Sequence, residues 1–529
     1  MTKRRYPIGI QTFSRIINEK YLYIDKTDLV WEIAHYSPFV FLSRPRRFGK
    51  SLLTSTLASY FNGEKELFEG LKIMELEQEW TSYPVIKLDL SIAKGQDSAE
   101  ALQARLMLML KNYVEDYGYD TDEVTPGGLF NGLINRAHRK TGKQIVVIID
   151  EYDAPLLEVM HEEKNLSAMR KVMQELYQPL KANEGIIRFC FITGITKFSQ
   201  LSIFSTINNL TNVTLDPKFA NICGITEKEL ATEMKEDIAQ LSVALEQSFE
   251  ETQRQLKVQY DGYHFTRNSE GVYNPFSLLK AFLQADISDY WFESGTPTVL
   301  INQMKHFNTD IMSLDSLEVP STAFDQPTEN MMSALPLLYQ SGYLTIKDYD
   351  RESRMYTLSI PNNEVRVGYV KGLLPYYAGL DDTDVQVGFA VKFWRALKKD
   401  DIECAMQEMQ TYMASIPYVE GFKKKLADIT SAEGFYEYTL YLIFSMLNVY
   451  VRTQVKCAGG RVDMVVWMPC KTYVFEMKVS GTAREALEQI DSKGYALPFN
   501  TDGKEVVKVG VKFNKDTRVP EEWVVEGKD

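Results

Sequence analysis

The feature that most restricts the fold of this chain is the octapeptide RPRRFGKS at residues 44–51. It follows the apolar run PFVFLS and leads into LLTSTLASYF, so Gly49, Lys50 and Ser51 stand where a buried strand turns into a helix. A helix that begins directly after a strand presents its first main-chain amides to an anion, as in a P-loop. The octapeptide therefore predicts an α/β domain that holds the phosphates of a nucleotide.

The residue types of this loop match that chemistry. Gly49 lets the main chain approach an anion, Lys50 can reach the outer phosphates, and the Ser51 hydroxyl can bind Mg²⁺. As a bare pattern, Phe-Gly-Lys-Ser also arises by chance or as an ordinary helix start. The motif therefore needs a second element elsewhere in the chain.

The loop departs from the P-loop pattern at its first position, where Arg44 replaces a glycine. Arg46, Arg47 and Phe48 complete the loop, and we include them among the nucleotide-binding candidates. The two arginines can act as an arginine finger for a neighbouring subunit or make simple contacts with phosphates or an acidic surface. The sequence leaves both roles open.

The second element is QIVVIIDEYD at residues 144–153, an apolar run that ends in Asp150 and Glu151. A central parallel strand delivers such carboxylates to the carboxyl edge of the sheet. There an aspartate can hold Mg²⁺ and the adjacent glutamate can polarise the attacking water. A buried strand with a polar exit is the plainer interpretation of the run alone, but its order after the lysine loop favours a nucleotide site.

A third apolar run, IIRFCFITGIT at residues 186–196, ends in hydroxyls and glycine. Thr193 or Thr196 can place a hydroxyl near the γ-phosphate. Polar strand ends of this kind are common in α/β proteins, so an ordinary strand end is the alternative.

The length of 529 residues predicts about three domains. Strand-like and helix-like stretches alternate over residues 1–225, which predicts a parallel sheet covered by helices on both faces. Residues 226–415 are mainly helix-like, with Thr226 and Glu229 spaced as a capping box, and fit a helical lid and a winged-helix-like middle region. The last domain is assigned to residues 416–529.

A second set of charged residues lies in this last domain, in GRVDMVVW and YVFEMKV. Glu476 and Lys478 are two apart in a strand and so face the same side. Asp463 and Glu476 can bind Mg²⁺ at a scissile phosphate, while Lys478 can orient or deprotonate the attacking water. Solvated charges on a hairpin are the alternative, which the apolar character of the strand disfavours.

Three more side chains can complete such a nuclease site. Glu433 or Glu437, one helical turn apart, can add a carboxylate from the preceding helix, and Gln489 on the following amphipathic helix can position a phosphate or a ligand.

Composition and net charge restrict which partners, thiol chemistry and cellular compartment we expect for the protein. The net charge of −13 argues against gripping DNA over the whole surface, although local basic surfaces remain open. The five cysteines are scattered and the five histidines are not paired with them at zinc spacing, so reduced core thiols are expected. With no signal core and no long uncharged apolar run, we expect a cytoplasmic protein without a membrane partner.

Taken together, several segments of the chain resemble a bacterial family that joins an AAA-ATPase-like domain to a PD-(D/E)XK nuclease-like domain. The resemblance spans nearly the whole chain and rests on RPRRFGKS, VVIIDEYDAPL, FITGITKFSQLSIFSTINNLTNVTLDP, the YDGYHF and VYNPFSLLKAF segments, and the GGRVDMVV and FEMKV pair. It implies an α/β fold with a P-loop NTPase sheet and a C-terminal domain like that of restriction endonucleases.

The resemblance also implies ligands. It implies ATP and Mg²⁺ at Lys50, Ser51 and Asp150, and a nuclease-like centre at Asp463, Glu476 and Lys478. The family pattern E-x-F-Y-H favours Glu433 over Glu437 as the helix acid. The family shares Arg44, so this residue does not exclude nucleotide, but it leaves hydrolysis undecided.

Three functions remain open from the sequence. The first is an ATP-regulated Mg²⁺ nuclease acting on nucleic acid, DNA in preference to RNA. The second is a nucleotide-switched binding scaffold whose nuclease-like domain does not cut, and the third is an ATPase acting on protein partners. The sequence also leaves open whether the chain forms a homo-oligomer.

Overall fold

We describe the chain from a computed structural model. It describes residues 4–157, 159, 163–197, 210–291, 298–307, 309, 314, 316–327, 331–369, 383–415, 451–457, 460–468, 471–499, 504–515, 517 and 519–527. The chain divides into two compact units. One consists of Met1–Glu293, Asn302–Thr309 and Leu314–Asn362, and the other of Ser294–Ile301, Asp310–Ser313 and Asn363–Asp529.

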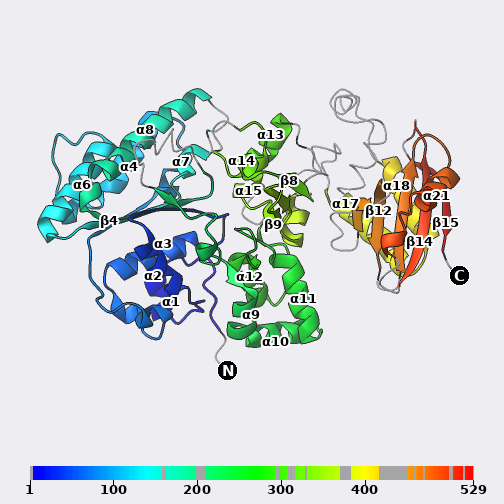
Figure 1. Cartoon of the computed structure of the whole chain (residues 1–529), viewed down its shortest axis with the longest axis horizontal. Coiled ribbons are helices and arrows are strands. Elements are labelled where there is room, and N and C mark those ends of the chain that lie inside the picture. The colour runs from blue at the N-terminus through cyan, green and yellow to red at the C-terminus, as the bar shows by residue number, and fades with distance from the viewer. Residues whose placement is uncertain are drawn as a thin grey trace. The chain divides into compact units, whose positions relative to one another are not determined.

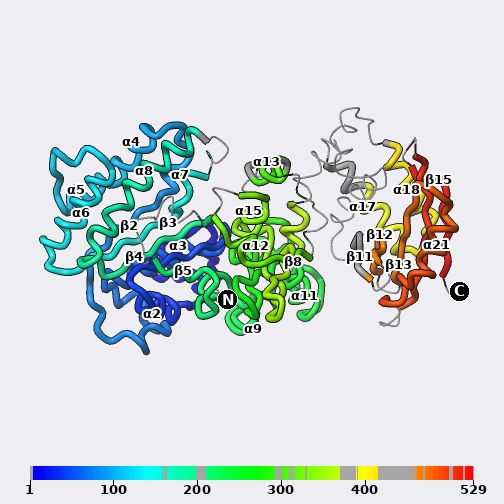
Figure 2. The backbone as a smooth tube through the Cα atoms, turned by 45° about the horizontal axis from the view of Figure 1, so that its top comes forward, coloured from blue at the N-terminus to red at the C-terminus, as the bar shows by residue number. Residues whose placement is uncertain are grey.

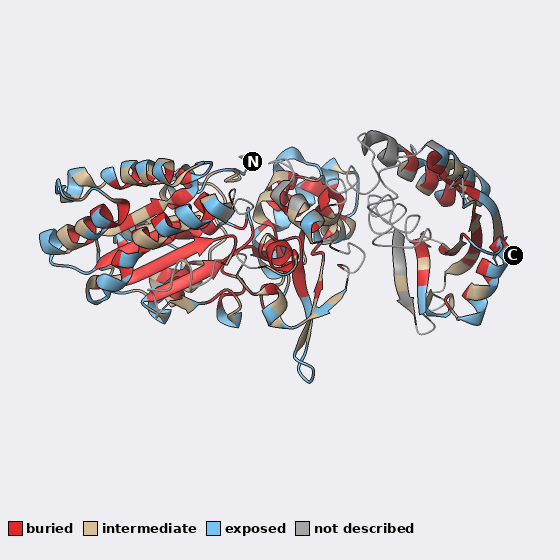
Figure 3. Cartoon of the chain, turned by 90° about the horizontal axis from the view of Figure 1, so that it is seen from above, coloured by how far each residue is buried: buried red, intermediate tan, exposed pale blue. Residues whose placement is uncertain are grey.

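The first unit is built on a five-stranded, fully parallel sheet (Figure 1). Its strands, in spatial order, are β2 (Val85–Asp89), β3 (Ile145–Asp150), β4 (Ile187–Gly194), β1 (Phe39–Ser43) and β5 (Thr211–Asn212). Every residue of β1 and β3 is buried, because helices cover both faces of the sheet (Figure 3). This sheet confirms the predicted P-loop-like α/β fold.

Two groups of helices form the outer layers. One face is covered by three helices that share its hydrophobic core, α4 (Ala99–Lys111), α6 (Pro126–Thr141) and α8 (Glu163–Ala182). On the other side lie α1 (Phe13–Asn18), α2 (Thr27–Tyr36) and α3 (Lys50–Phe61) (Figure 1). The short helices α5 (Val114–Tyr117) and α7 (Ala154–Leu157) belong to the first group. The carboxyl ends of β1, β3 and β4 therefore meet at one edge of a rigid sheet.

A helical region follows the parallel sheet. It contains α9 (Glu227–Glu233), α10 (Lys235–Ala244), α11 (Phe249–Tyr260) and α12 (Pro275–Gln284), together with the two-stranded pair β6 (Ile225–Thr226) and β7 (Val272–Tyr273). The predicted capping box is confirmed, since the Thr226 hydroxyl accepts from the Glu229 amide and the Glu229 carboxylate accepts from the Thr226 amide.

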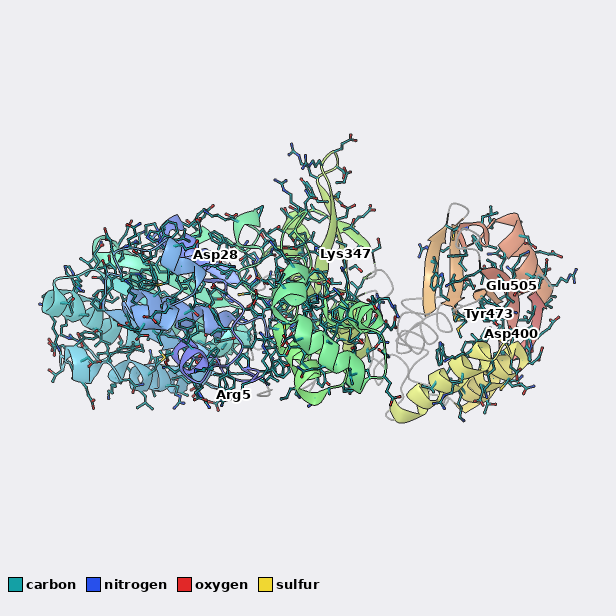
Figure 4. The ribbon with its side chains drawn as sticks, turned by 90° about the horizontal axis from the view of Figure 1, so that it is seen from below. Arg5, Asp28, Lys347, Asp400, Tyr473 and Glu505 are labelled. Atoms are coloured by element: carbon teal, nitrogen blue, oxygen red, sulfur yellow. The ribbon has the colours of Figure 1, made fainter. Side chains whose placement is uncertain are left out.

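The rest of the first unit is a small antiparallel sheet with short helices. β8 (Leu317–Val319) is followed by α14 (Ser321–Phe324), α15 (Leu335–Gln340) and the hairpin of β9 (Thr345–Asp350) and β10 (Met355–Ser359), with strand order β8-β10-β9. α13 (Thr298–His306) precedes them in the chain. The hairpin projects from its surroundings (Figure 4). The winged-helix-like character of this region stays a prediction.

The second unit contains a mixed five-stranded sheet (Figure 2). Its strands, in spatial order, are β11 (Val451–Cys457), β12 (Gly460–Trp467), β13 (Lys471–Lys478), β14 (Glu505–Phe513) and β15 (Pro520–Glu526). Only β13 and β14 are parallel, and α21 (Ala483–Ser492) is the crossover between them.

Helices cover both faces of this sheet as well. α17 (Thr383–Lys398) and α18 (Ile402–Ser415) share one hydrophobic core with the strands, and α21 closes a smaller core on the other face. Asp400, in the turn between α17 and α18, accepts hydrogen bonds from Lys471 at 2.6 Å and from the Tyr473 hydroxyl at 2.8 Å (Figure 4). These two helices thus join the sheet although they precede residue 415, where we place the last domain boundary.

Candidate functional sites

The phosphate-loop candidate links β1 to α3. Ser43 ends the strand, Lys50 begins the helix, and Gly49 between them has a left-handed backbone with φ of +89°. That conformation favours glycine over any residue with a Cβ. The sequence therefore forms a strand-loop-helix turn whose first helical amides are free to face an anion.

Arg44 explains how the loop forms without its first glycine. The Arg44 side chain is 1% exposed and donates to the carbonyls of Ser43 at 2.9 Å, Thr214 at 3.0 Å and Phe219 at 2.9 Å. Its guanidinium carbon lies 4.3 Å from the centroid of the Phe265 ring. Burial lowers the pKa of Arg44 to about 10. Arg44 is therefore a structural anchor under the loop.

The charged candidates of the loop and of β3 lie together. The Lys50 ammonium donates to the carbonyls of Arg44 at 3.1 Å and Pro45 at 3.2 Å, and lies 3.7 Å from the Glu151 carboxylate. The Asp150 carboxylate accepts from the Thr54 hydroxyl of α3 at 3.3 Å, and burial raises the pKa of Asp150. Glu151 has φ of +50°, an uncommon value for a residue with a side chain.

This arrangement fits Mg²⁺ and a triphosphate chemically. The Ser51 hydroxyl at the start of α3 and the Asp150 carboxylate at the end of β3 are both hard oxygen donors. The Lys50 ammonium and the first amides of α3, at the positive end of the helix dipole, can bind phosphate oxygens.

Neither threonine at the end of β4 presents an uncommitted hydroxyl. The Thr193 hydroxyl is buried and donates to the Leu42 carbonyl at 2.7 Å, and the Thr196 hydroxyl donates to the Asp153 carboxylate at 2.7 Å. Both hydroxyls stabilise the strand ends, and the sensor role remains a prediction.

The three middle residues of the loop differ in exposure. Arg46 and Arg47 are exposed, whereas Phe48 is buried against the rings of Tyr263 and Phe265 at 4.7 and 5.2 Å between centroids. The Arg47 guanidinium lies 4.1 Å from the centroid of the Phe276 ring, so it makes a cation–π contact. Phe48 thus anchors the loop by packing.

An apolar cavity of about 110 Å³ adjoins the start of α3. It lies beside Gly49, and its other lining residues come from three separate parts of the first unit, represented by Tyr23 and Ile24, by Ile222 and Cys223, and by Leu279. Sequence reasoning missed this cavity because its lining residues come from segments far apart in the chain, whose approach local patterns do not predict.

The nuclease-site candidates meet on the face of the second sheet that α21 covers. Lys478 donates to the Gln489 side-chain oxygen at 2.8 Å, and the Gln489 side-chain nitrogen donates to the buried Glu476 carboxylate. The Asp463 carboxylate accepts from the Met477 amide at 2.7 Å, which fixes it beside the same stretch of β13. Hydrogen bonds thus join Glu476, Lys478 and Gln489, and Asp463 on β12 is bonded to the main chain of β13 between Glu476 and Lys478.

The donors at this second centre fit a divalent cation in part. Asp463 and Glu476 supply two hard carboxylates on neighbouring strands. Among the described residues, no group of three His, Cys, Asp or Glu side chains is placed to hold a metal ion. Glu433 and Glu437, the acids expected to add a further carboxylate, lie outside the described residues.

Two further features escaped the sequence analysis. Asp153 is buried and accepts from the amides of Ile195 and Thr196, and Tyr263 and Phe265 support the loop from a segment far along the chain. The pattern DEYD contains a signal for Asp153, since an acid so close to a buried strand needs a partner.

The comparisons with known proteins agree with these two centres. Residues 7–204 match the model of a family described as a predicted AAA-ATPase, and residues 431–523 match the PD-(D/E)XK nuclease superfamily. The chain is 31% identical over 532 residues to an uncharacterized protein in the vnfD 5′ region of Azotobacter chroococcum mcd 1, covering 99% of each protein.

Solved structures are more distant. Two structures of Drosophila ORC, one bound to poly(dA/dT) DNA and Cdc6 and one to GC-rich DNA and Cdc6, match with TM-scores of 0.23 and identities of 11% and 10%. Each match covers 82% of this chain and 61% of the other. A TM-score this low does not establish a shared fold.

The fold and its two centres define a nucleotide-binding, nuclease-like protein. The chain belongs to the family that joins a predicted AAA-ATPase domain to a PD-(D/E)XK nuclease superfamily domain, the family of its Azotobacter relative. In the described part of the chain, every helix is too short or too polar to cross a lipid bilayer.

Proposed function

We propose that this protein binds ATP with Mg²⁺ at the first centre and hydrolyses phosphodiester bonds of nucleic acid, DNA in preference to RNA, at the second. The observation that carries the proposal is that Gln489 on α21 bonds to both Glu476 and Lys478 on β13, while Asp463 bonds to the main chain between them. An acid pair and an ammonium on one buried sheet face have no evident packing purpose, but they suit phosphoryl chemistry.

In the first centre, Lys50 and the α3 amides bind the phosphates, and the apolar cavity beside Gly49 receives the base. Ser51 and Asp150 would hold Mg²⁺, which would neutralise phosphate charge when bound. The Lys50 ammonium exchanges part of its contact with the loop carbonyls for phosphate oxygens, and Glu151, which lies 3.7 Å from that ammonium, orients the attacking water.

In the second centre, Asp463 and Glu476 would hold Mg²⁺, which would supply Lewis-acid chemistry at the scissile phosphate. Lys478 orients the attacking water, and Gln489 fixes the positions of both Lys478 and Glu476. In the hydrolysis, water adds its oxygen to phosphorus, one ester P–O bond breaks, and the leaving sugar oxygen takes up a proton.

Cleavage of plasmid DNA, single-stranded DNA and RNA in Mg²⁺, with and without ATP, tests this function. Wild-type protein is expected to cut, and Glu476→Ala and Lys478→Ala are expected to abolish cutting. Glu488→Ala, an exposed neighbour of Gln489 on α21, is the matched control and should cut as wild type does. Equal cutting by wild type and both site variants would refute the site.

A nucleotide-switched binding scaffold is the second candidate. The observation in its favour is that, within the described residues, the second centre assembles two carboxylates and no third. Binding of nucleic acid without any Mg²⁺-dependent cleavage would support the scaffold over the nuclease.

A further inference from the structure

The turn after β3 and the exit from β4 are joined by a set of hydrogen bonds centred on Asp153. Its carboxylate accepts from the Ile195 amide at 3.1 Å, and from the amide and hydroxyl of Thr196 at 2.6 and 2.7 Å. Tyr152 adds two more, from its amide to the Thr193 carbonyl and from its hydroxyl to the Thr196 carbonyl. We call Tyr152, Asp153, Ile195 and Thr196 the Asp153 clamp.

The space around the clamp requires a small residue at position 194. A Cβ added to Gly194 would lie 2.3 Å from the Asp153 carboxylate and 2.5 Å from the Tyr152 ring. Asp153 and Tyr152 are both fully buried. The clamp is therefore a close-packed connection between two neighbouring strands.

Glu151 is held between two fixed neighbours. On one side its amide donates to the Asp150 carboxylate at 2.9 Å, and on the other the clamp holds Tyr152 and Asp153. With φ of +50°, its backbone has a conformation that only such anchors maintain. The direction of the Glu151 carboxylate toward Lys50 thus depends on the clamp.

The clamp continues into the later part of the first unit. Directly after Thr196, the Lys197 amide donates to the Gln340 side-chain oxygen at 2.6 Å, and the Lys197 ammonium pairs with Asp325 at 3.0 Å. Gln340 is 5% exposed and donates to the carbonyls of Phe324 and Gln326. The exit of β4 is therefore fastened to the segment from α14 to α15.

The phosphate loop touches the same segment independently. A Cβ added to Gly342, just beyond α15, would lie 2.7 Å from the Pro45 Cβ, so loop and segment are in close contact. Two elements at the nucleotide site, the loop and the β4 exit, thus meet one short stretch of chain.

We propose that Asp153 is a positioning residue that sets Glu151 at the nucleotide site and, through Lys197, couples the state of that site to residues 321–342. The inference rests on the proposed binding of ATP at the first centre. A shift of Glu151 on binding of the triphosphate changes the clamp, and the clamp changes the Lys197 contacts with Asp325 and Gln340.

The experiment combines two measurements on the full-length protein with Mg²⁺. Binding of a fluorescent ATP analogue gives the Kd, and hydrogen exchange with and without ATPγS gives the protection of residues 321–342. The variants are Asp153→Ala, Asp153→Asn and Lys197→Ala, with the exposed Lys171→Ala as control.

In wild type and Lys171→Ala, ATPγS is expected to raise protection of residues 321–342. Asp153→Ala and Lys197→Ala should bind the analogue within about twofold of the wild-type Kd and lose that rise. Where ATP is turned over, Asp153→Ala should lower kcat at least about tenfold with little change in KM. Asp153→Asn keeps an acceptor for Thr196 and should restore most of both signals.

The outcomes separate the two proposals. An undiminished rise of protection in both Asp153→Ala and Lys197→Ala would overturn the coupling while leaving ATP binding intact. Failure of wild type to bind the analogue, with no difference from Lys50→Ala, would overturn the proposed nucleotide site and the coupling with it. If Asp153→Ala does not fold, Lys197→Ala alone decides, since its side chain lies nearer the surface.

Discussion

The guanidinium of Arg44 lies 4.3 Å from the centroid of the Phe265 ring, beneath a loop that carries glycine at this position in most P-loops. Its three hydrogen bonds go to main-chain carbonyls of Ser43, Thr214 and Phe219, and they tie β1 to the segment after β5. A residue that looks like a defect in a motif is thus part of the support of that motif.

Restoring the motif glycine should therefore destabilise the protein. We expect Arg44→Gly to lower the free energy of unfolding by about 3–5 kcal/mol, because it leaves buried carbonyls without donors and removes a buried ring contact. Chemical denaturation measures the change. Arg46→Ala, an exposed arginine in the same loop, should shift the midpoint little, and an equal shift in both variants would contradict the anchoring role of Arg44.

Gly510 controls how closely α21 packs on β14. A Cβ at this position would lie 2.1 Å from the Ala483 carbonyl oxygen and 2.7 Å from the Leu487 amide nitrogen, which are main-chain atoms of α21. We expect Gly510→Ala to destabilise the second unit by about 1–3 kcal/mol and to displace Gln489 from Glu476. Thermal unfolding and a cleavage assay check this.

Gly527→Ala is the control for that substitution. Its added Cβ would meet the Glu505 carboxylate at 3.1 Å, the end of a flexible side chain that can move. If Gly510→Ala unfolded at the same temperature as wild type, the added methyl group would fit without cost. That result would contradict the close packing of α21 on β14.

The second unit should need α17 and α18 in order to fold. A fragment of residues 383–529 keeps the core that these helices share with the sheet, together with the bonds of Asp400 to Lys471 and Tyr473. A fragment of residues 416–529 exposes the apolar side chains of that core, so we expect it to aggregate or remain unfolded. Circular dichroism and size-exclusion chromatography compare the two, and a well-folded shorter fragment would count against the shared core.

Asp153 should make stability depend on pH. Burial, and then the charge of Glu151, raises the pKa of Asp153 to about 6 in the folded protein, whereas an unfolded aspartate titrates near 3.9. Below about pH 4 both states hold the proton, and as the pH rises to about 6 the unfolded state ionises first and is favoured. Ionisation of Asp153 should therefore lower the free energy of unfolding above pH 6 by about 2–3 kcal/mol relative to its value at pH 4.

The comparison with Asp153→Asn isolates this effect, because asparagine does not titrate. The free energy of unfolding of wild type, relative to that of the variant, should fall between pH 4 and pH 7 in denaturation curves. A difference that stays constant over that range, or grows in favour of wild type, would show that folding does not raise the pKa of Asp153.

The sequence predicts the strand ends of both sheets because each is an apolar run with a polar exit. Asp150 is the last residue of β3, and Glu476 and Lys478 share a face because residues two apart in a strand do so. Gln489 could be selected because the amphipathic helix after β13 had to return over the same face. These inferences use local periodicity and chain order.

The supporting contacts could not be predicted in this way. The partners of Arg44 are main-chain carbonyls, which leave no mark in the sequence, and Asp153 accepts from amides for the same reason. The packing of Phe48 depends on rings more than two hundred residues away in the chain. Such contacts follow from the folded path of the backbone, which periodicity does not give.

Phe48 and Pro45 are enclosed by segments that come much later in the chain, the first by Tyr263 and Phe265 and the second by Gly342. A gene fusion or recombination event that kept only the amino-terminal sheet would therefore leave the loop without its cover. The phosphate loop and these later segments must therefore be inherited together. Over evolution, the ATPase-like part of this protein can be exchanged only together with the later segments that pack against its loop.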